Sequence, residues 1–352
     1  MTELLVGTKK GLFALEGEPG GPYEVTARAF DGEPVEYAMR DPATGRVVAT
    51  VTSPFYGPKI FCADEPGGEF AQAEGIELPE DGDKALERMW VIVAGEDGVL
   101  YAGGDPGVLF TSTDGGASWE LVRSLWDHPT RPEWKPGGGG LCLHSIVPWP
   151  GEPDKLALAM SAVGVWLTDD RLQTWRNGND GLVARYLPED AAPSLTFCVH
   201  DLHRAPRRPE RMFMQFHGGV YRSDDAGSSW TAIGDGLPSD FGFPMVLDPA
   251  DPDSAYVIPL AADSDRVTPG GRVRVYETRD AGETWTARGE GLPAENAYLT
   301  ILRQALDRAG EGESLELYFG ATSGSVFGSG DAGASWFTVA EHLPPVYSVR
   351  TA

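Results

Sequence analysis

Short apolar runs that end in an aromatic side chain recur along the chain, and each is followed by a polar, turn-like segment. The runs are Gly11 to Phe13, Lys59 to Phe61, Val108 to Phe110, Val165 to Trp166, Val220 to Tyr221, Val275 to Tyr276 and Val326 to Phe327. Short runs of β-branched and aromatic residues between turn residues are typical of β-strands. The 352 residues also include 45 Gly and 28 Pro, so the pattern predicts an all-β protein.

The polar segment after five of these runs has one shared form, Ser/Thr-x-Asp-x-Gly-x-Ser/Thr-Trp, and we call these eight-residue segments box turns. They begin at Ser112, Thr168, Ser223, Thr278 and Ser329, and the second carries Leu172 in place of Gly. The tryptophans that end them are 56, 55, 55 and 51 residues apart. A repeat of this length suits one four-stranded sheet. Two weaker units come first, at Glu16 to Pro19 and at Ala63 to Phe70, which makes seven.

The residues of a box turn explain its form. A carboxylate two residues into a tight turn can accept backbone N–H groups, the Gly can adopt positive φ, and the Trp ring can be buried between sheets. Because every unit carries nearly the same box, we interpret these aspartates as turn-forming. A catalytic site or a calcium site would need dissimilar groups in one place.

The box turns resemble the repeats of the BNR/Asp-box family, which includes sialidases, sortilin-type receptor domains and photosystem II assembly factors. The resemblance extends over the whole chain and implies a β-propeller, here with seven blades in a single domain, 1–352. We expect the blades at 1–30 with 345–352, 31–75, 84–123, 141–178, 197–234, 243–288 and 297–340. Family members differ widely in activity, so the resemblance indicates a fold and not a function.

The segment 141–178 predicts four strands, Leu143 to Trp149, Lys155 to Met160, Gly164 to Asp169 and Thr174 to Asn177. The first unit begins at its second strand, Glu3 to Gly7. The last residues, Val346 to Arg350, form a further β-type run that no unit uses. We therefore expect the C-terminal strand to join the N-terminal blade and close the ring.

The net charge and the N-terminal segment limit the classes of protein to which the chain can belong. The formal net charge is −25 and no cluster of Lys and Arg stands out, which argues against nucleic acid and anionic membranes as partners. The segment Met1 to Lys10 lacks the basic and apolar regions of a signal peptide, and no apolar run approaches roughly 18 residues. Three cysteines without a CxxC spacing favour free thiols. We expect a cytoplasmic protein.

The surface opposite the box turns is the expected place for function. The box turns join the third and fourth strands of each blade, so they mark one end of the ring. Two long connections reach the other end, Ser124 to Gly140, with Trp126, Arg131 and Trp134, and Asn177 to Thr196, with Arg185 and Tyr186. Long loops on a rigid scaffold are often functional.

Three of the six histidines are expected in one quadrant of that end. Cys142-Leu-His144 and Cys198-Val-His200 open neighbouring blades 56 residues apart, and His217 ends a second strand. The equivalent positions of other blades carry Glu36, Phe243 and Tyr347, with Trp90 as the expected residue of blade three. Neutral imidazole binds Zn, Fe, Cu, Mn or Ni, so His144, His200 and His217 are candidate ligands of a divalent transition metal.

Two other readings of these residues remain. Inner-strand histidines also form hydrogen bonds to neighbouring blades without binding a metal. Cys142 and Cys198 share the face of the histidines and are either thiolate ligands or buried, inert thiols.

Two functional hypotheses of different class follow. The first is an enzyme for a small molecule or glycan, a metal-assisted hydrolase, lyase or oxidoreductase, in which Glu36, Arg185 and Tyr186 act on or fix the substrate. A sialidase is disfavoured, because no Arg-Ile-Pro segment precedes the blades and the spacing places no arginine triad. The second is a non-catalytic binding or assembly propeller, whose top rim holds a protein partner with Trp126 and Trp134 as anchors.

Overall fold

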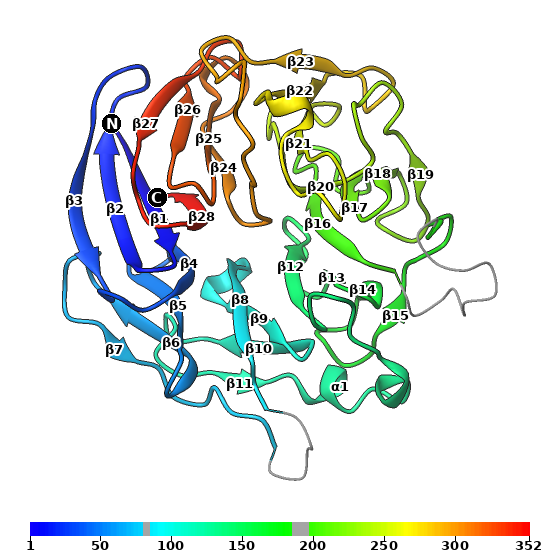
Figure 1. Cartoon of the computed structure of the whole chain (residues 1–352). Coiled ribbons are helices and arrows are strands. Elements are labelled where there is room, and N and C mark those ends of the chain that lie inside the picture. Colours follow the sequence, from blue (N-terminus) through cyan, green and yellow to red (C-terminus); the bar gives the residue numbers. More distant parts are fainter. Residues whose placement is uncertain (80–84, 185–196) are drawn as a thin grey trace.

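The computed structural model describes residues 1–79, 85–184 and 197–352, and it is a ring of seven four-stranded antiparallel sheets (Figure 1). From the axis outward, the first three blades are β28 (Val346–Thr351), β1 (Thr2–Thr8), β2 (Gly11–Gly17) and β3 (Tyr23–Ala29); β4 (Val35–Arg40), β5 (Val47–Ser53), β6 (Gly57–Ala63) and β7 (Ala71–Gln72); and β8 (Arg88–Ala94), β9 (Leu100–Asp105), β10 (Val108–Ser112) and β11 (Glu120–Leu121). The predicted seven-bladed all-β propeller is confirmed.

The other four blades follow the same order. They are β12 (Leu143–Pro148), β13 (Leu156–Met160), β14 (Gly164–Thr168) and β15 (Arg176–Asn177); β16 (Val199–Arg204), β17 (Met212–Phe216), β18 (Gly219–Ser223) and β19 (Thr231–Ala232); β20 (Gly242–Leu247), β21 (Ala255–Pro259), β22 (Val275–Thr278) and β23 (Thr286–Arg288); and β24 (Leu306–Ala309), β25 (Glu316–Gly320), β26 (Val326–Ser329) and β27 (Phe337–Ala340). The described helices are single turns, α1 (Arg123–Trp126), η1 (Glu96–Gly98), η2 (Arg131–Glu133), η4 (Pro269–Gly271) and η5 (Gly312–Ser314).

The C-terminal strand closes the ring, as the sequence predicts. Strand β28 pairs antiparallel with β1, with Val349 opposite Val6, and the Ala352 N–H donates to the Glu3 carbonyl at 3.0 Å. Both termini therefore belong to one blade (Figure 1). A sheet made from both ends of the chain leaves no inner edge unpaired and ties the first blade to the last.

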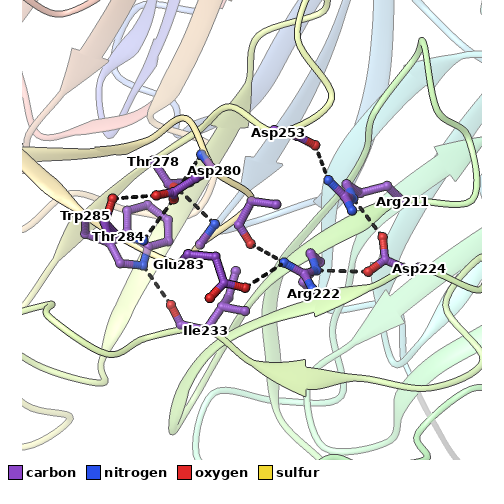
Figure 2. Close-up of polar contacts among 12 residues, drawn as sticks. Arg211, Arg222, Asp224, Ile233, Asp253, Thr278, Asp280, Glu283, Thr284 and Trp285 are labelled. Carbon is purple, nitrogen blue, oxygen red and sulfur yellow. Dashed lines mark hydrogen bonds and ion pairs between the residues drawn. The ribbon is translucent and has the colours of Figure 1, made fainter.

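Each of the five box turns is held by its own carboxylate. In the turn of blade six (Figure 2), Asp280 accepts from the Thr284 N–H at 2.8 Å, from the Thr284 hydroxyl at 2.6 Å and from the Thr278 hydroxyl at 2.8 Å. The Gly282 backbone has φ +92°, a conformation that suits glycine. The hydrogen bond from the Thr284 hydroxyl is the largest cause that lowers the pKa of Asp280. The turn therefore satisfies its buried and charged groups internally.

Two tryptophans of the box turns form ring hydrogen bonds to the neighbouring blade. The Trp230 ring is 5 % exposed and its Nε1–H donates to the Gly178 carbonyl of the preceding blade at 2.8 Å. Trp285 likewise donates to the Ile233 carbonyl at 2.7 Å (Figure 2). These rings fill the space between two sheets, so the repeat that marks the sequence also joins the blades.

Arginines add further ties between blades five and six at the same end of the ring. Arg211 lies between Asp224 and Asp253, and its Nε is 2.7 Å from the Asp224 carboxylate (Figure 2). Arg222 donates to the Ala281 carbonyl at 2.7 Å. Every charge in this group has an opposite charge or a carbonyl beside it. Within the part of the chain that is described, no helix combines the length and apolar character that a membrane crossing requires.

Candidate ligand-binding site

Two cavities follow the axis of the ring, and Gln304 lines both of them. The lower cavity, about 580 Å³, lies among the ends of the inner strands, near Arg40, Arg204 and Thr351. The upper cavity, about 350 Å³, lies among their beginnings, at the end opposite the box turns. The inner strands that carry both cavities surround the centre of the ring (Figure 1). The upper cavity has the size of a small-molecule site.

The upper cavity is lined by the first residues of several inner strands. Glu36 of β4, Trp90 of β8, Phe243 of β20 and Tyr347 of β28 all line it, together with His200 of β16. These are the positions that alignment of the repeat places at one level. The prediction that Glu36, Trp90, Phe243 and Tyr347 are equivalent is therefore confirmed, since matched strands present matched residues to the axis.

Two of the three predicted histidines meet in this cavity. The His217 Nδ1 and the His200 Nε2 are 3.3 Å apart, and Cys198 joins them, with the three ligand atoms within 4.8 Å of one another. Burial, the largest cause, lowers the pKa of both imidazoles, so both stay neutral near pH 7. His200 is 1 % exposed, and its Nδ1 lies 2.6 Å from the Gly242 carbonyl, to which it donates.

His144, the third predicted metal ligand, is not part of this group. Its Nε2 lies 3.1 Å from the Ser161 hydroxyl and its Nδ1 lies 3.3 Å from the Ser145 hydroxyl. Burial lowers its pKa to about 3. His144 and His200 hold equivalent positions in their blades, but the two serines orient the His144 ring differently. The structure thus brings together Cys198, His200 and His217 instead of the three histidines.

Glu36 lies in the same cavity, but not with the histidines. Its carboxylate is 3.3 Å from the Arg88 Nε and its side chain is 5 % exposed. Burial is the largest cause that raises the pKa of Glu36, and the charge of Arg88 lowers it. Glu36 is not in the group of three converging ligand atoms and is instead paired with an arginine.

Arg303 is a cavity residue that the repeat did not predict. It lies three residues before β24, in the blade whose equivalent position is unclear from sequence. Its guanidinium carbon lies 4.6 Å from the centre of the Phe243 ring and 6.0 Å from that of Trp90. Its Nε is buried without a hydrogen-bond partner. Within the described parts of the chain, no carboxylate pairs with this guanidinium.

Three other described arginines also have a buried Nε without a partner, and they differ from Arg303. The terminal nitrogens of Arg46, Arg204 and Arg350 form hydrogen bonds, for example from Arg46 to the Gly115 carbonyl at 3.5 Å and from Arg350 to the Leu306 carbonyl at 2.9 Å. For Arg303, no hydrogen bond to a described residue involves any of its three nitrogens. Its contacts are with the faces of aromatic rings.

The long connection after blade three reaches the cavity, as expected, but Trp134 does not point outward, and Trp126 is half-buried. Gly137 to Gly139 line the cavity. Trp134 is 2 % exposed, donates to the Thr130 hydroxyl at 3.0 Å and packs on Trp166. Arg131 stacks on Trp126 at 4.1 Å. Trp134 is therefore unavailable as an anchor for a partner, because its ring is part of the core.

The other predicted site residues, Arg185 and Tyr186, lie outside the described residues. Of the predicted catalytic and metal-binding residues, the upper cavity contains Glu36, His200 and His217. Cys198, which the sequence left open between a ligand and an inert thiol, and Arg303 also line it.

Comparisons with known proteins support the fold and leave the activity open. No family model matches the chain, and no curated protein matches its sequence. Solved propellers are similar in structure. An ancestral GH74 enzyme has 16% identity and a TM-score of 0.57, over 90% of this chain and 38% of that one, so this chain spans well under half of that enzyme.

Two further structures match over nearly the whole of their own length. YCF48 bound to D1 peptide has 14% identity and a TM-score of 0.52, over 86% of this chain and 84% of that one. A candidate 6-phosphogluconolactonase from Bacteroides uniformis has 11% identity and a TM-score of 0.60, over 100% and 99%. At these identities the likeness shows a shared β-propeller fold, found both in enzymes and in a protein with a bound peptide.

Proposed function

We propose that this propeller binds a small anionic molecule in its upper cavity, with the Arg303 guanidinium as the group that receives a carboxylate or phosphate. The observation that carries the proposal is the absence of a counter-charge beside Arg303 among the described residues, while its Nε is buried without a partner. Arg303 is half-buried, and a partly desolvated cation without an anion beside it carries a free-energy cost. A bound anion removes that cost.

The other charges of the cavity do not supply this anion. The Glu36 carboxylate is 3.3 Å from Arg88, and the Asp263 carboxylate lies beside Arg266 at 2.5 Å and His217 at 3.8 Å. Each carboxylate is thus already neutralised by an arginine of its own. The described lining of the cavity has one cation in excess, in a chain whose net charge is −25. A local excess of this kind favours an anionic ligand.

The walls of the cavity favour an organic ligand. Trp90, Phe243 and Tyr347 offer ring faces, and two of these rings hold the guanidinium plane. A planar guanidinium fixed in this way presents two parallel N–H groups to a carboxylate or phosphate. The volume of about 350 Å³ suits a molecule of modest size.

Binding is favoured over glycoside hydrolysis by the same charges. A glycosidase needs one carboxylic acid and one free carboxylate on either side of the scissile bond. Glu36 and Asp263 are the described carboxylates that line the cavity, and arginines hold both. The regular box turns support a place for the chain among the BNR/Asp-box propellers, a family in which binding proteins stand beside enzymes.

Calorimetric titration with matched probes tests the proposal. Benzoate and inorganic phosphate are compared with benzamide, which has the shape of benzoate without its charge. We expect at least one anion to bind with 1:1 stoichiometry. The affinity for benzamide should be lower by a factor of roughly 10 or more. Arg303→Met should lower the affinity for the anion by about 10- to 100-fold. Arg303→Lys should have an affinity between those of the wild type and Arg303→Met, because lysine keeps the charge without the planar guanidinium.

Arg28→Met is the matched control. Arg28 also stacks on an aromatic ring, Phe13 at 5.0 Å, but it is exposed and paired with Asp31 at 2.9 Å. Its loss should leave the affinity unchanged. Equal binding of benzoate and benzamide, or an affinity that Arg303→Met leaves intact, would overturn the proposal.

A further inference from the structure

A second group of side chains, which does not include Arg303, lines the same cavity. We infer that Cys198, His200 and His217 form a binding site for a late divalent transition metal, of which Zn²⁺ is the best fit, with an open coordination position toward the cavity. The three ligand atoms lie within 4.8 Å of one another, and each of the three residues lines the upper cavity.

The backbone brings the three side chains together. Cys198 directly precedes β16, and the two-residue period of a strand places it on the face of His200. His217 follows β17, whose last residue, Phe216, is opposite Val199 in the sheet. The His217 N–H donates to the Cys198 carbonyl at 3.0 Å, which fixes the turn against the strand. The site therefore stands on paired strands of one rigid blade.

The outer nitrogen of His200 already has the hydrogen-bond partner that a metal ligand requires, and the outer nitrogen of His217 has a carboxylate nearby. His200 Nδ1 donates to the Gly242 carbonyl at 2.6 Å, so its Nε2 carries the lone pair and faces His217. His217 Nε2 lies 3.8 Å from the Asp263 carboxylate, so its Nδ1 faces His200. A backbone carbonyl and a carboxylate behind two converging imidazoles are the outer partners typical of metal sites.

The spacing of the inner nitrogens agrees with coordination. Two nitrogens about 2.0–2.1 Å from a zinc ion at a tetrahedral angle are roughly 3.3–3.4 Å apart. The observed distance from His200 Nε2 to His217 Nδ1 is 3.3 Å. Without a metal, that pair shares one proton. When a metal binds, the His217 proton moves to Nε2, toward Asp263, and the Cys198 thiol releases its proton to water, so one proton leaves for each ion bound.

The ligand types select the metal. Two imidazoles and one thiolate suit Zn²⁺, Co²⁺ or copper, and are poor ligands for Mg²⁺ or Ca²⁺. Zinc sites with three protein ligands keep a fourth position for water or a ligand. Here that position opens toward the cavity of Arg303, so an anion held by Arg303 can also reach the metal.

Cobalt titration of protein purified without a histidine tag and stripped with a chelator tests this site. We expect one Co²⁺ per chain and a near-ultraviolet thiolate-to-cobalt band, displaced by one equivalent of Zn²⁺. Cys198→Ser should abolish the band, and His200→Gln or His217→Gln should weaken binding more than 10-fold. Asp263→Asn should weaken it by about 10- to 100-fold, because it removes the carboxylate behind His217.

The chain offers a matched control for the thiol. Cys142 occupies the equivalent position in blade four, but its Sγ lies 3.1 Å from the Gly139 carbonyl and is not in the group of converging ligand atoms. Cys142→Ser should keep the cobalt band. Absence of stoichiometric Co²⁺ or Zn²⁺ binding in the wild-type chain, or equal loss in Cys142→Ser and Cys198→Ser, would overturn the inference.

The two sites can fail separately. Anion titration of the chelated protein reports on Arg303 alone, and cobalt titration of Arg303→Met reports on the metal ligands alone. Retained cobalt binding in Arg303→Met supports an independent metal site, whereas its loss there contradicts the ligand set.

Discussion

The box turns and the upper cavity lie at opposite ends of the same seven sheets, and their charged groups are arranged in opposite ways. In a box turn, a carboxylate such as Asp280 accepts three hydrogen bonds from its own hairpin. In the cavity, Arg303 has no hydrogen bond to a described residue, although it lies among aromatic rings. The box turns satisfy their polar groups internally, whereas the cavity leaves this guanidinium open to a ligand.

Stability and binding are therefore located at different ends of this ring. Five closely similar turns add a similar local stabilisation to the blades that carry them. A polar group that binds a ligand is incompletely hydrogen-bonded in the free protein and so destabilises it. A group that already has all its hydrogen bonds gains little free energy from a ligand. Substitutions at the two ends should therefore separate the two properties.

The largest effect is expected for Trp230→Ala, at the box-turn end. The ring is 5 % exposed and donates to Gly178 in the preceding blade, so its loss should cost about 3–5 kcal/mol of unfolding free energy. Trp90→Ala at the cavity wall should cost roughly half as much or less, because Trp90 is partly exposed and its Nε1–H has no hydrogen-bond partner in the structure. Urea unfolding of both variants measures this difference, and equal losses would contradict the comparison.

A smaller effect is expected for Asp280→Asn. The carboxamide keeps the shape but loses the charge that three donors share, so the variant should lose about 1–2 kcal/mol at pH 7. The pKa of Asp280 is lowered in the folded state, so its contribution is present above pH of about 4 and is lost as the pH falls through the folded value. Acid unfolding of the variant should therefore be shallower below pH of about 4.

Glu283→Gln in the same turn is the control for Asp280→Asn. Glu283 lies 3.8 Å from Arg222 and its side chain is 74% exposed, so its neutralisation should change the free energy of unfolding by less than about 0.5 kcal/mol. A variant Asp280→Asn as stable as the wild type at pH 7 would show that the carboxylate is dispensable to the turn.

The smallest effect is expected for Arg303→Met, and its sign is opposite. Removal of an unpaired cation from aromatic walls should leave stability within about 1 kcal/mol of the wild type, or raise it. The same substitution at Arg211, which lies between Asp224 and Asp253, should cost about 1–3 kcal/mol, because two carboxylates lose their partner. Thermal unfolding compares the two, and a loss above about 2 kcal/mol for Arg303→Met would make Arg303 a structural residue.

The repeat predicted what is common to all blades and missed what differs between them. The spacing of the box turns predicted the number of sheets, and the alignment of inner strands placed Glu36, Phe243 and Tyr347 around one cavity. The same alignment grouped His144 with His200. The orientation of each ring depends on local acceptors, Ser161 for one and the Gly242 carbonyl of the next blade for the other, and a repeat does not encode these neighbours.

Arg303 was missed for a related reason. In blade seven the regular strand begins only at Leu306, so the residue that reaches the cavity lies in an irregular segment before it. Cys198 was recognised as sharing a face with His200, but its convergence with His217 depends on the turn after β17. Irregular segments before strands and turns after them thus determine which side chains meet in the cavity, while the regular strands determine the number of blades.

Gln304 gives the ring a further property. Its Nε2 donates to the His144 carbonyl at 2.8 Å, from blade seven to blade four, and its Oε1 accepts from Arg350. Because this side chain borders both cavities, it spans the axis at the level where they meet. It therefore ties two blades that are not neighbours in the ring, in addition to the contacts between adjacent sheets.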